Sequence, residues 1–167
     1  MSADNGTFAD LFAANNEFTK NFEPHKLTGR ALKGLAIVTC MDSRIEPLKI
    51  VGMKAGDAKI LRNAGARVTE DVLRTLILAT HLLNVTRVLV MPHTDCRMAS
   101  GTEDEVHAAI KERSGVDTRG IEIRTVKDQA AALNADLTRI KSFPLLPKEL
   151  AITGAIYDVK SGKLNQI

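Results

Sequence analysis

The sequence contains no tryptophan, one tyrosine and two cysteines among its 167 residues. So few cysteines exclude a small fold that depends on several disulfides. No apolar stretch reaches the roughly 18 residues that a membrane-spanning helix needs. The basic residues are scattered and give a net charge of only +3. We therefore expect neither a membrane nor a nucleic acid as a partner.

The amino terminus, MSADNGTFAD, is polar and mildly acidic, unlike a secretory signal peptide, so a cytoplasmic protein is expected. Apolar residues make up 44% and charged residues 26%, a composition typical of globular proteins. A chain of 167 residues is long enough to bury one continuous core without disulfides. We expect a single domain over residues 1–167, in which residues 1–28 form an N-terminal helical arm.

Four of the five phenylalanines lie within residues 7–22. Their mixed helical spacing predicts an amphipathic helix that lies on the body of the fold. An arm this apolar needs a surface to cover, and a second subunit is one candidate. A homodimer, or a larger oligomer built from dimers, is therefore expected.

Short apolar runs alternate with helical patterns along the rest of the chain. Strands are predicted at LAIVTC (35–40), DAKILRNAG (57–65), TRVLVMP (86–92) and IEIRTV (121–126). Helices are predicted at 69–84, 101–115 and 127–143. The tail, residues 150–167, predicts a strand, a Lys-Ser-Gly turn and a short return segment.

This alternation predicts an α/β fold: a mostly parallel central β-sheet flanked by helices, with an antiparallel edge strand from the C-terminal tail. Thr69 is the predicted N-cap of the helix at 69–84, because acids follow it in the first turn. The apolar positions of that helix run nearly all round its circumference. Burial on more than one side is therefore expected.

Reactive or polar residues lie at the ends of three predicted strands. Cys40 ends the first strand, Asn63 to Gly65 end the second, and His93 to Cys96 follow the third. Because ligands collect at the carboxyl ends of parallel strands, we expect these residues to form one site. The two cysteines and His93 suit a catalytic zinc ion, which takes three protein ligands and one water.

Each candidate also has a simpler interpretation. A lone cysteine in an apolar strand is commonly a small buried hydrophobic residue. Asp42 and Arg44 could form a solvated ion pair worth at most about 1 kcal/mol; beside a metal, Asp42 would orient a bound water and Arg44 would hold Asp42. His81 and His107 are expected to be partly exposed helix residues, and His25 a loop residue.

The motif CMDSR, followed later by HTDC and with GDAKILRNAG between them, resembles the β-class carbonic anhydrases, whose signature is Cys-x-Asp-x-Arg and His-x-x-Cys. The resemblance is strong over residues 33–113 and extends to the tail GAIYDVKSGKL. It implies a parallel α/β sheet that is extended when two chains pair in a dimer. It also implies a carbonate dehydratase, a zinc lyase that interconverts CO2 and bicarbonate through zinc-bound hydroxide.

The resemblance assigns a role to each residue of the motifs. It implies that the zinc ligands are Cys40, His93 and Cys96. It implies that Asp42 and Arg44 are catalytic, and that the substrate-binding residues are Asn63, Ala64 and Gly65. Gly65 also has a purely structural interpretation, as a turn residue that needs a positive φ.

Two features depart from the family pattern. Arg97 stands where the family usually has a glycine; its side chain could narrow the pocket, add positive charge near the zinc or point to solvent. The chain lacks the tryptophan that some members use to bind inhibitory bicarbonate. Two alternative functions stay open: a carbonyl sulfide or carbon disulfide hydrolase on the same scaffold, and a non-catalytic zinc-binding homologue, which only Arg97 favours.

Overall fold

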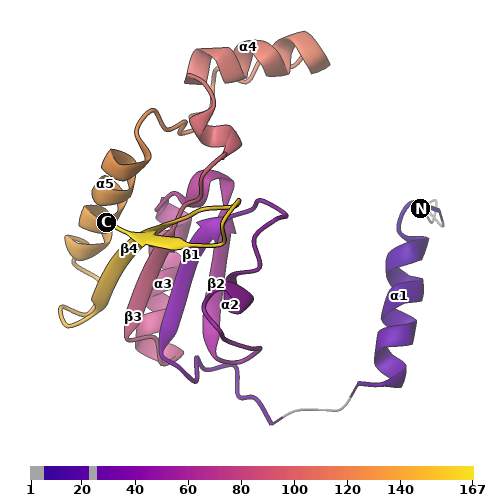
Figure 1. Cartoon of the computed structure of the whole chain (residues 1–167), viewed down its shortest axis with the longest axis vertical. Helices are drawn as coiled ribbons and strands as arrows, with labels where there is room; N and C mark the ends of the chain where they lie inside the picture. Colours follow the sequence, from indigo (N-terminus) through magenta and orange to yellow (C-terminus); the bar gives the residue numbers. More distant parts are fainter. Residues whose placement is uncertain (1–5, 23–25) are drawn as a thin grey trace.

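A five-stranded sheet lies at the centre of the computed structural model, which describes residues 6–22 and 26–167 (Figure 1). The strand order is β2-β1-β3-β4-β5. The strands are β1 Leu35–Cys40, β2 Ala58–Asn63, β3 Arg87–Met91, β4 Ala151–Tyr157 and β5 Leu164–Gln166. β1 to β4 run parallel and β5 pairs antiparallel with β4. The predicted α/β fold with an antiparallel C-terminal edge is confirmed.

β1 is an inner strand, and all six of its residues are buried because both of its faces are covered. Its register places Cys40 opposite Asn63 of β2, and Thr39 opposite Met91 of β3. The carboxyl ends of these three strands therefore lie at one edge of the sheet. Residues that follow β1, β2 and β3 are brought together there.

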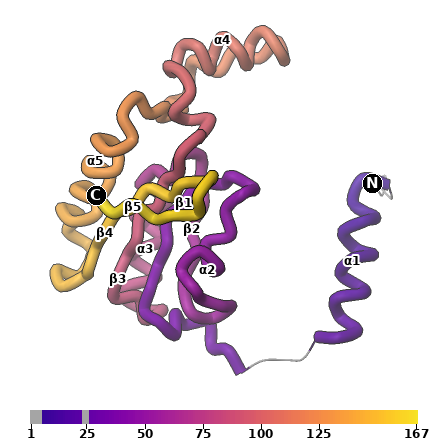
Figure 2. Tube along the Cα trace, viewed as in Figure 1, coloured from indigo at the N-terminus to yellow at the C-terminus, as the bar shows by residue number. Residues whose placement is uncertain are grey.

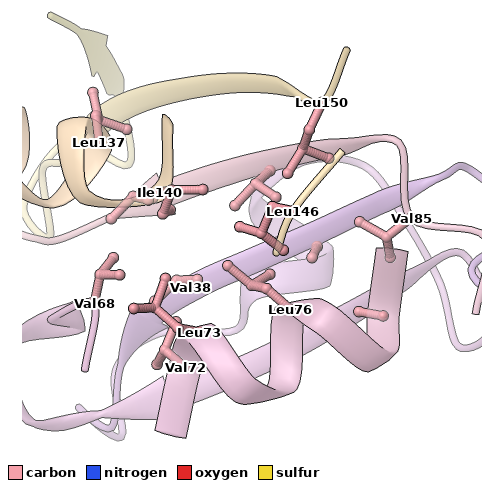
Figure 3. Close-up of a cluster of buried hydrophobic side chains, with 14 of the residues drawn as sticks. Val38, Val68, Val72, Leu73, Leu76, Val85, Leu137, Ile140, Leu146 and Leu150 are labelled. Atoms are coloured by element: carbon pink, nitrogen blue, oxygen red, sulfur yellow. The ribbon is translucent and has the colours of Figure 1, made fainter. Parts of the chain in front are cut away.

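Successive residues of β1 point to opposite faces of the sheet and enter two separate cores. The first core contains Ala36 and Val38 with side chains from α3 (Glu70–Leu82) and α5 (Gln129–Lys141), and Figure 3 shows part of it. Both helices begin at side-chain caps, Thr69 for α3 and Asp128 for α5. The capping of α3 agrees with the prediction.

α3 buries only one side within this chain. Its buried residues are Val72, Leu73, Leu76 and Ala79. On the outer side, Leu78 is 45% exposed and Leu82 is 63% exposed. The expected burial on more than one side is therefore not found in the single chain.

The second core lies on the opposite face and contains Leu35 and Ile37 of β1. Its cover comes from the short helix α2 (Pro47–Ile50), the segment around it, and the β4–β5 hairpin. Cys40 and Cys96 both belong to this second core. The sulfur atoms of the candidate site are thus surrounded largely by apolar side chains.

α4, Glu103–Ser114, lies away from the sheet at the far end of the molecule (Figure 1). A capping box formed by Thr102 and Glu105 begins the helix. Gly115 ends it in the left-handed conformation with φ 74°, which glycine adopts readily.

The prediction of a strand at IEIRTV is wrong, because this segment is irregular. The backbone N–H groups of Ile123 and Arg124 donate to the carboxylate of Glu103, over 2.6 Å and 3.2 Å. Arg124 has φ 66°, which is incompatible with a strand. The apolar residues of this segment are buried only in part, and they do not form a strand. The Glu103 carboxylate accepts two backbone N–H groups that would otherwise be available to a neighbouring strand.

α1, Ala9–Lys20, stands apart from the sheet in both Figure 1 and Figure 2. None of its residues is buried, and Phe12 is 70% exposed. The helix is confirmed, but the expectation that it lies on the body of its own chain is wrong. Within the part of the chain that the structure describes, no helix is long and apolar enough to cross a membrane.

Candidate metal centre

Cys40, His93 and Cys96 meet at the carboxyl edge of the sheet. Cys40 is the last residue of β1, and the other two follow β3. All three are buried, and one potential ligand atom from each lies within 4.8 Å of the others. The two sulfur atoms are 3.9 Å apart. The structure thus brings together the three residues that the sequence motifs single out.

The hydrogen bonds of His93 determine which ring nitrogen is free. Nδ1 lies 2.8 Å from the Thr94 carbonyl oxygen, and a carbonyl only accepts, so Nδ1 carries the proton. Nε2 therefore presents its lone pair. It is buried and has no hydrogen-bond partner among the described residues. A buried nitrogen of this kind is unfavourable unless an unseen group, such as a metal ion, binds it.

The loop that carries His93 is fixed to the neighbouring strand and helix. The Gln129 side chain donates to the His93 carbonyl oxygen over 2.7 Å. Tyr157 at the end of β4 donates its N–H to Pro92 and accepts the N–H of Thr94, over 2.8 Å and 2.9 Å. These contacts set the position of the imidazole before any ligand binds.

The Cys96 thiol lies in surroundings that disfavour a free negative charge. Burial, reinforced by the nearby Cys40 sulfur, raises the pKa of the Cys96 thiol to about 11. The backbone N–H of Gly65 donates to the Cys40 sulfur over 3.4 Å. A divalent cation would supply the positive charge that paired thiolates need here.

Arg44 holds Asp42 beside this cluster. Its side chain donates to both carboxylate oxygens, over 2.9 Å and 2.8 Å, and its backbone N–H donates to Oδ1. These hydrogen bonds hold the pKa of the Asp42 carboxyl well below its ordinary range. Asp42 Oδ2 is 3.8 Å from His93 Nε2, so the carboxylate lies next to the cluster while it stays paired with Arg44.

Two further residues of this network were missed by sequence reasoning. Asp95 accepts from Arg44 over 2.7 Å, and Arg62 donates to the carbonyl oxygens of Cys40 and Asp42, over 2.9 Å and 2.6 Å. Asp95 stands inside the HTDC motif and Arg62 directly before Asn63, so position beside a motif was the available signal. Neither position reveals the partner, because each contact joins distant segments.

The loop after β2 lies against the cluster. Asn63 accepts the N–H of Arg67 and donates to the Arg67 carbonyl oxygen, over 2.8 Å and 2.7 Å, so its amide group closes the turn. Ala64 and Gly65 follow, and Gly65 has φ 78°. A Cβ at Gly65 would lie 3.2 Å from Met98, so both the conformation and the space favour glycine. Contact of this loop with a substrate stays a prediction.

The other described candidates of the sequence are not members of the cluster. Arg97 is exposed and donates to Ser100 over 2.9 Å within its own turn. His81 is exposed as predicted, but His107 is buried, at 7% exposure, and its Nδ1 pairs with Thr118 over 2.8 Å. The prediction of a partly exposed His107 is therefore wrong. His25 lies outside the described residues.

The chemistry of the donor set fits a zinc ion. Two sulfurs and one imidazole nitrogen are the ligands that zinc prefers in tetrahedral sites. The proton on Nδ1 leaves Nε2 as the available donor, and a backbone N–H supports one sulfur. Because Arg44 holds Asp42, no fourth side chain occupies the cluster in this arrangement of the described residues. Such a centre could bind a metal and keep one position for water or a substrate.

Known proteins are similar to this chain both in sequence and in fold. Residues 35–135 match the family model described as carbonic anhydrase. Beta-carbonic anhydrase 1 of Mycobacterium tuberculosis is 33% identical over 162 residues, which cover 96% of this chain and 98% of the relative. A carbon disulfide hydrolase of Saccharolobus solfataricus is 30% identical over 183 residues, with 90% and 87% covered. A solved carbonic anhydrase from Streptococcus mutans is 34% identical, with a TM-score of 0.89, and the match covers 100% of this chain and 99% of that one.

Proposed function

The chain belongs to the β-class carbonic anhydrases, a family of carbonate dehydratases, and from this premise we propose that it catalyses the reversible hydration of CO2 to bicarbonate. We further propose that one zinc ion is held by Cys40, His93 and Cys96. The observation that carries the proposal is the buried, unpartnered Nε2 of His93, a residue that has a ring nitrogen within 4.8 Å of both sulfurs. A bound zinc ion would act as a Lewis acid that makes water nucleophilic near neutral pH.

Asp42 and Arg44 are the proposed catalytic residues. The Asp42 carboxylate lies beside the cluster, where it can accept a hydrogen bond from the reacting water and orient its lone pair toward CO2. Arg44 keeps the carboxylate in this position through a bidentate pair, and Asp95 in turn holds Arg44. The new C–O bond forms between the water oxygen and the carbon of CO2, while one C=O π bond breaks and its electron pair passes to that oxygen of CO2. One proton leaves to solvent, and the product is bicarbonate.

Asn63, Ala64 and Gly65 are proposed to form the wall of the substrate pocket. Their loop passes the Cys40 sulfur, which supports a position near the reacting carbon. Because the Asn63 amide group is engaged by the Arg67 backbone, this residue would shape the wall mainly by holding the turn.

We propose that the protein is a homodimer formed by a single-domain chain, with α1 as an arm that covers the second subunit. The support is the exposed apolar surface of α1: Phe8, which precedes the helix, and Phe12 and Phe18 within it are all more than half exposed. The exposed outer side of α3, with Leu82 at 63%, supplies further apolar surface to cover. A cytoplasmic location stays a prediction.

The test of the function combines metal analysis with turnover. Purified protein should contain one zinc per chain and hydrate CO2 in a stopped-flow pH-change assay. His93→Ala should lose both properties, whereas His81→Ala, a change at an exposed histidine that is not part of the cluster, should lose neither. Stoichiometric zinc without CO2 hydration from about pH 6 to 9, on either side of the roughly neutral pKa of zinc-bound water, would show a non-catalytic homologue.

Turnover of carbonyl sulfide and carbon disulfide should be measured beside that of CO2. This comparison is needed because a carbon disulfide hydrolase is among the relatives. A large preference for either sulfur compound would replace CO2 as the substrate while leaving the metal assignment intact.

A further inference from the structure

A buried ion pair lies close to the metal cluster but outside the signature motifs. Arg67 follows the loop at residues 63–66, and Asp136 is on α5. Arg67 Nε donates to Asp136 Oδ2 over 2.7 Å, and the side chains are only 20% and 7% exposed. By contrast, the side chains of the Arg119–Asp117 pair are 70% and 43% exposed. Burying two charges carries a desolvation penalty, so a buried pair is weak support for a role in stability alone.

Arg67 joins three segments of the chain around the site. Its guanidinium contacts Asp136 of α5 and donates to the Arg124 carbonyl oxygen over 3.4 Å. Its backbone N–H and carbonyl oxygen both bond to the Asn63 side chain. The guanidinium therefore anchors one end of the turn at residues 63–67 to α5 and to the segment that follows α4.

That turn carries the donor that reaches a metal ligand. Gly65 lies between the two ends of the turn and donates its N–H to the Cys40 sulfur over 3.4 Å. Its position is tightly limited, because a Cβ there would come within 3.2 Å of Met98. Arg67 and Asp136 also line a cavity of about 10 Å³ that Gly65 and Cys96 border. The ion pair and the cluster therefore share one closely packed region.

We propose that Arg67 and Asp136 are positioning residues, which hold the Gly65 N–H on the Cys40 sulfur and thereby tune this sulfur as a metal ligand. The inference rests on the metal site of the proposed function and is independent of the substrate. A hydrogen bond to a thiolate withdraws electron density from sulfur and fixes its direction. Its loss would leave a more strongly donating but less constrained ligand.

The test uses cobalt(II) in place of zinc, because thiolate-to-cobalt charge-transfer absorption reports directly on the sulfur ligands. Asp136→Asn keeps the shape of the side chain but removes its charge. We expect the band to move to longer wavelength and release of the metal to a chelator to become about tenfold faster, the size of effect typical of groups that orient metal ligands. Asp117→Asn, which breaks the exposed arginine pair, should change neither quantity.

A purely structural pair would give a different result. If folded Asp136→Asn melts at a lower temperature but keeps the wild-type cobalt band and release rate, the positioning role is refuted. If the proposed ligand assignment is wrong, Cys40→Ala should instead bind cobalt fully. That result would overturn the ligand assignment on which the inference depends, and it is distinguishable from the first.

A measurement on the wild-type protein covers the case in which Asp136→Asn does not fold. In protein loaded with cadmium-113, a hydrogen bond to a ligating sulfur transmits scalar coupling between the amide proton and the metal. A coupling at the Gly65 amide that is retained in the Asp117→Asn protein supports the proposal. Absence of the coupling in the wild-type protein overturns it.

Discussion

The two cores on opposite faces of the sheet differ in what they hold. The first core consists of aliphatic side chains from the strands, from α3 and α5, and from connecting segments between the elements (Figure 3). The second core contains two cysteines whose sulfurs are 3.9 Å apart, next to a buried histidine. One sheet thus carries an inert face and a face with reactive groups. The comparison teaches that apolar surroundings can serve packing on one side and chemistry on the other.

The physical difference lies in the unsatisfied groups. Dispersion and apolar burial complete the first core, so removing a side chain there leaves a void. The second core leaves a buried imidazole nitrogen and two buried thiols that a metal ion would complete. We therefore expect mutations in the first core to reduce stability and mutations at the cluster to remove metal.

The largest effect is expected at the cluster itself. Cys96→Ala should abolish bound zinc and reduce CO2 hydration to the uncatalysed rate, because only two protein donors remain. Metal analysis and a stopped-flow assay check both. Met98→Leu, a volume-conserving change in the same core, should keep the metal. Full zinc occupancy in Cys96→Ala would contradict the assignment.

The matching change in the first core is Leu76→Ala. Leu76 is fully buried, so its truncation should lower the free energy of unfolding by about 2–5 kcal/mol. Zinc per folded chain should stay unchanged. Urea denaturation and metal analysis measure the two quantities. Leu82→Ala, on the exposed side of the same helix, should have little effect on an isolated chain; a similar loss would show that a partner covers that side.

α1 sharpens the comparison, because it contributes to neither core. Deleting residues 1–22 should leave the sheet folded but raise the dimer dissociation constant by more than about tenfold, since one buried phenylalanine is worth about 1.5–3 kcal/mol. Analytical ultracentrifugation and circular dichroism separate the two outcomes. A full-length protein that is a monodisperse 18.1 kDa monomer at micromolar concentration would argue against the dimer.

A smaller effect is expected beside the cluster. Arg44→Ala should leave zinc bound but reduce kcat/KM for CO2 by about 10–100-fold, because Asp42 loses the partner that orients it. Arg119→Ala is a matched control, since it removes an arginine that makes a similar bidentate pair with Asp117 at an exposed position. Wild-type kinetics in Arg44→Ala would show that the pairing of Arg44 with Asp42 has no catalytic role.

The smallest effect is expected at Arg97. Its side chain is exposed and bonded to Ser100, so Arg97→Gly should retain zinc and alter turnover or anion inhibition only modestly. Steady-state kinetics with and without added anions measure the change. Identical kinetics and anion inhibition in both proteins would show that this departure from the family pattern has no effect on activity.

Patterns that depend on neighbouring residues were predictable from the sequence. β1 could be recognised from the sequence because a strand that is buried on both faces, such as LAIVTC, is a continuous apolar run. α3 could be recognised because Thr69 precedes a helical apolar pattern as its N-cap. The meeting of Cys40, His93 and Cys96 was also predictable. Parallel strands place their carboxyl ends at one edge, so residues at those ends converge whatever the details of packing.

The tertiary structure decided the contacts between distant segments. Glu103 accepts the backbone N–H groups of Ile123 and Arg124, which are therefore not paired with a neighbouring strand, and Thr118 is the partner of the buried His107. Asp95 and Arg62 enter the network of the site only because folding brings their segments beside Arg44 and Cys40. Such partners leave no periodic pattern in the sequence. Local spacing sets secondary structure, whereas the pairing of buried polar groups depends on which loops meet in space.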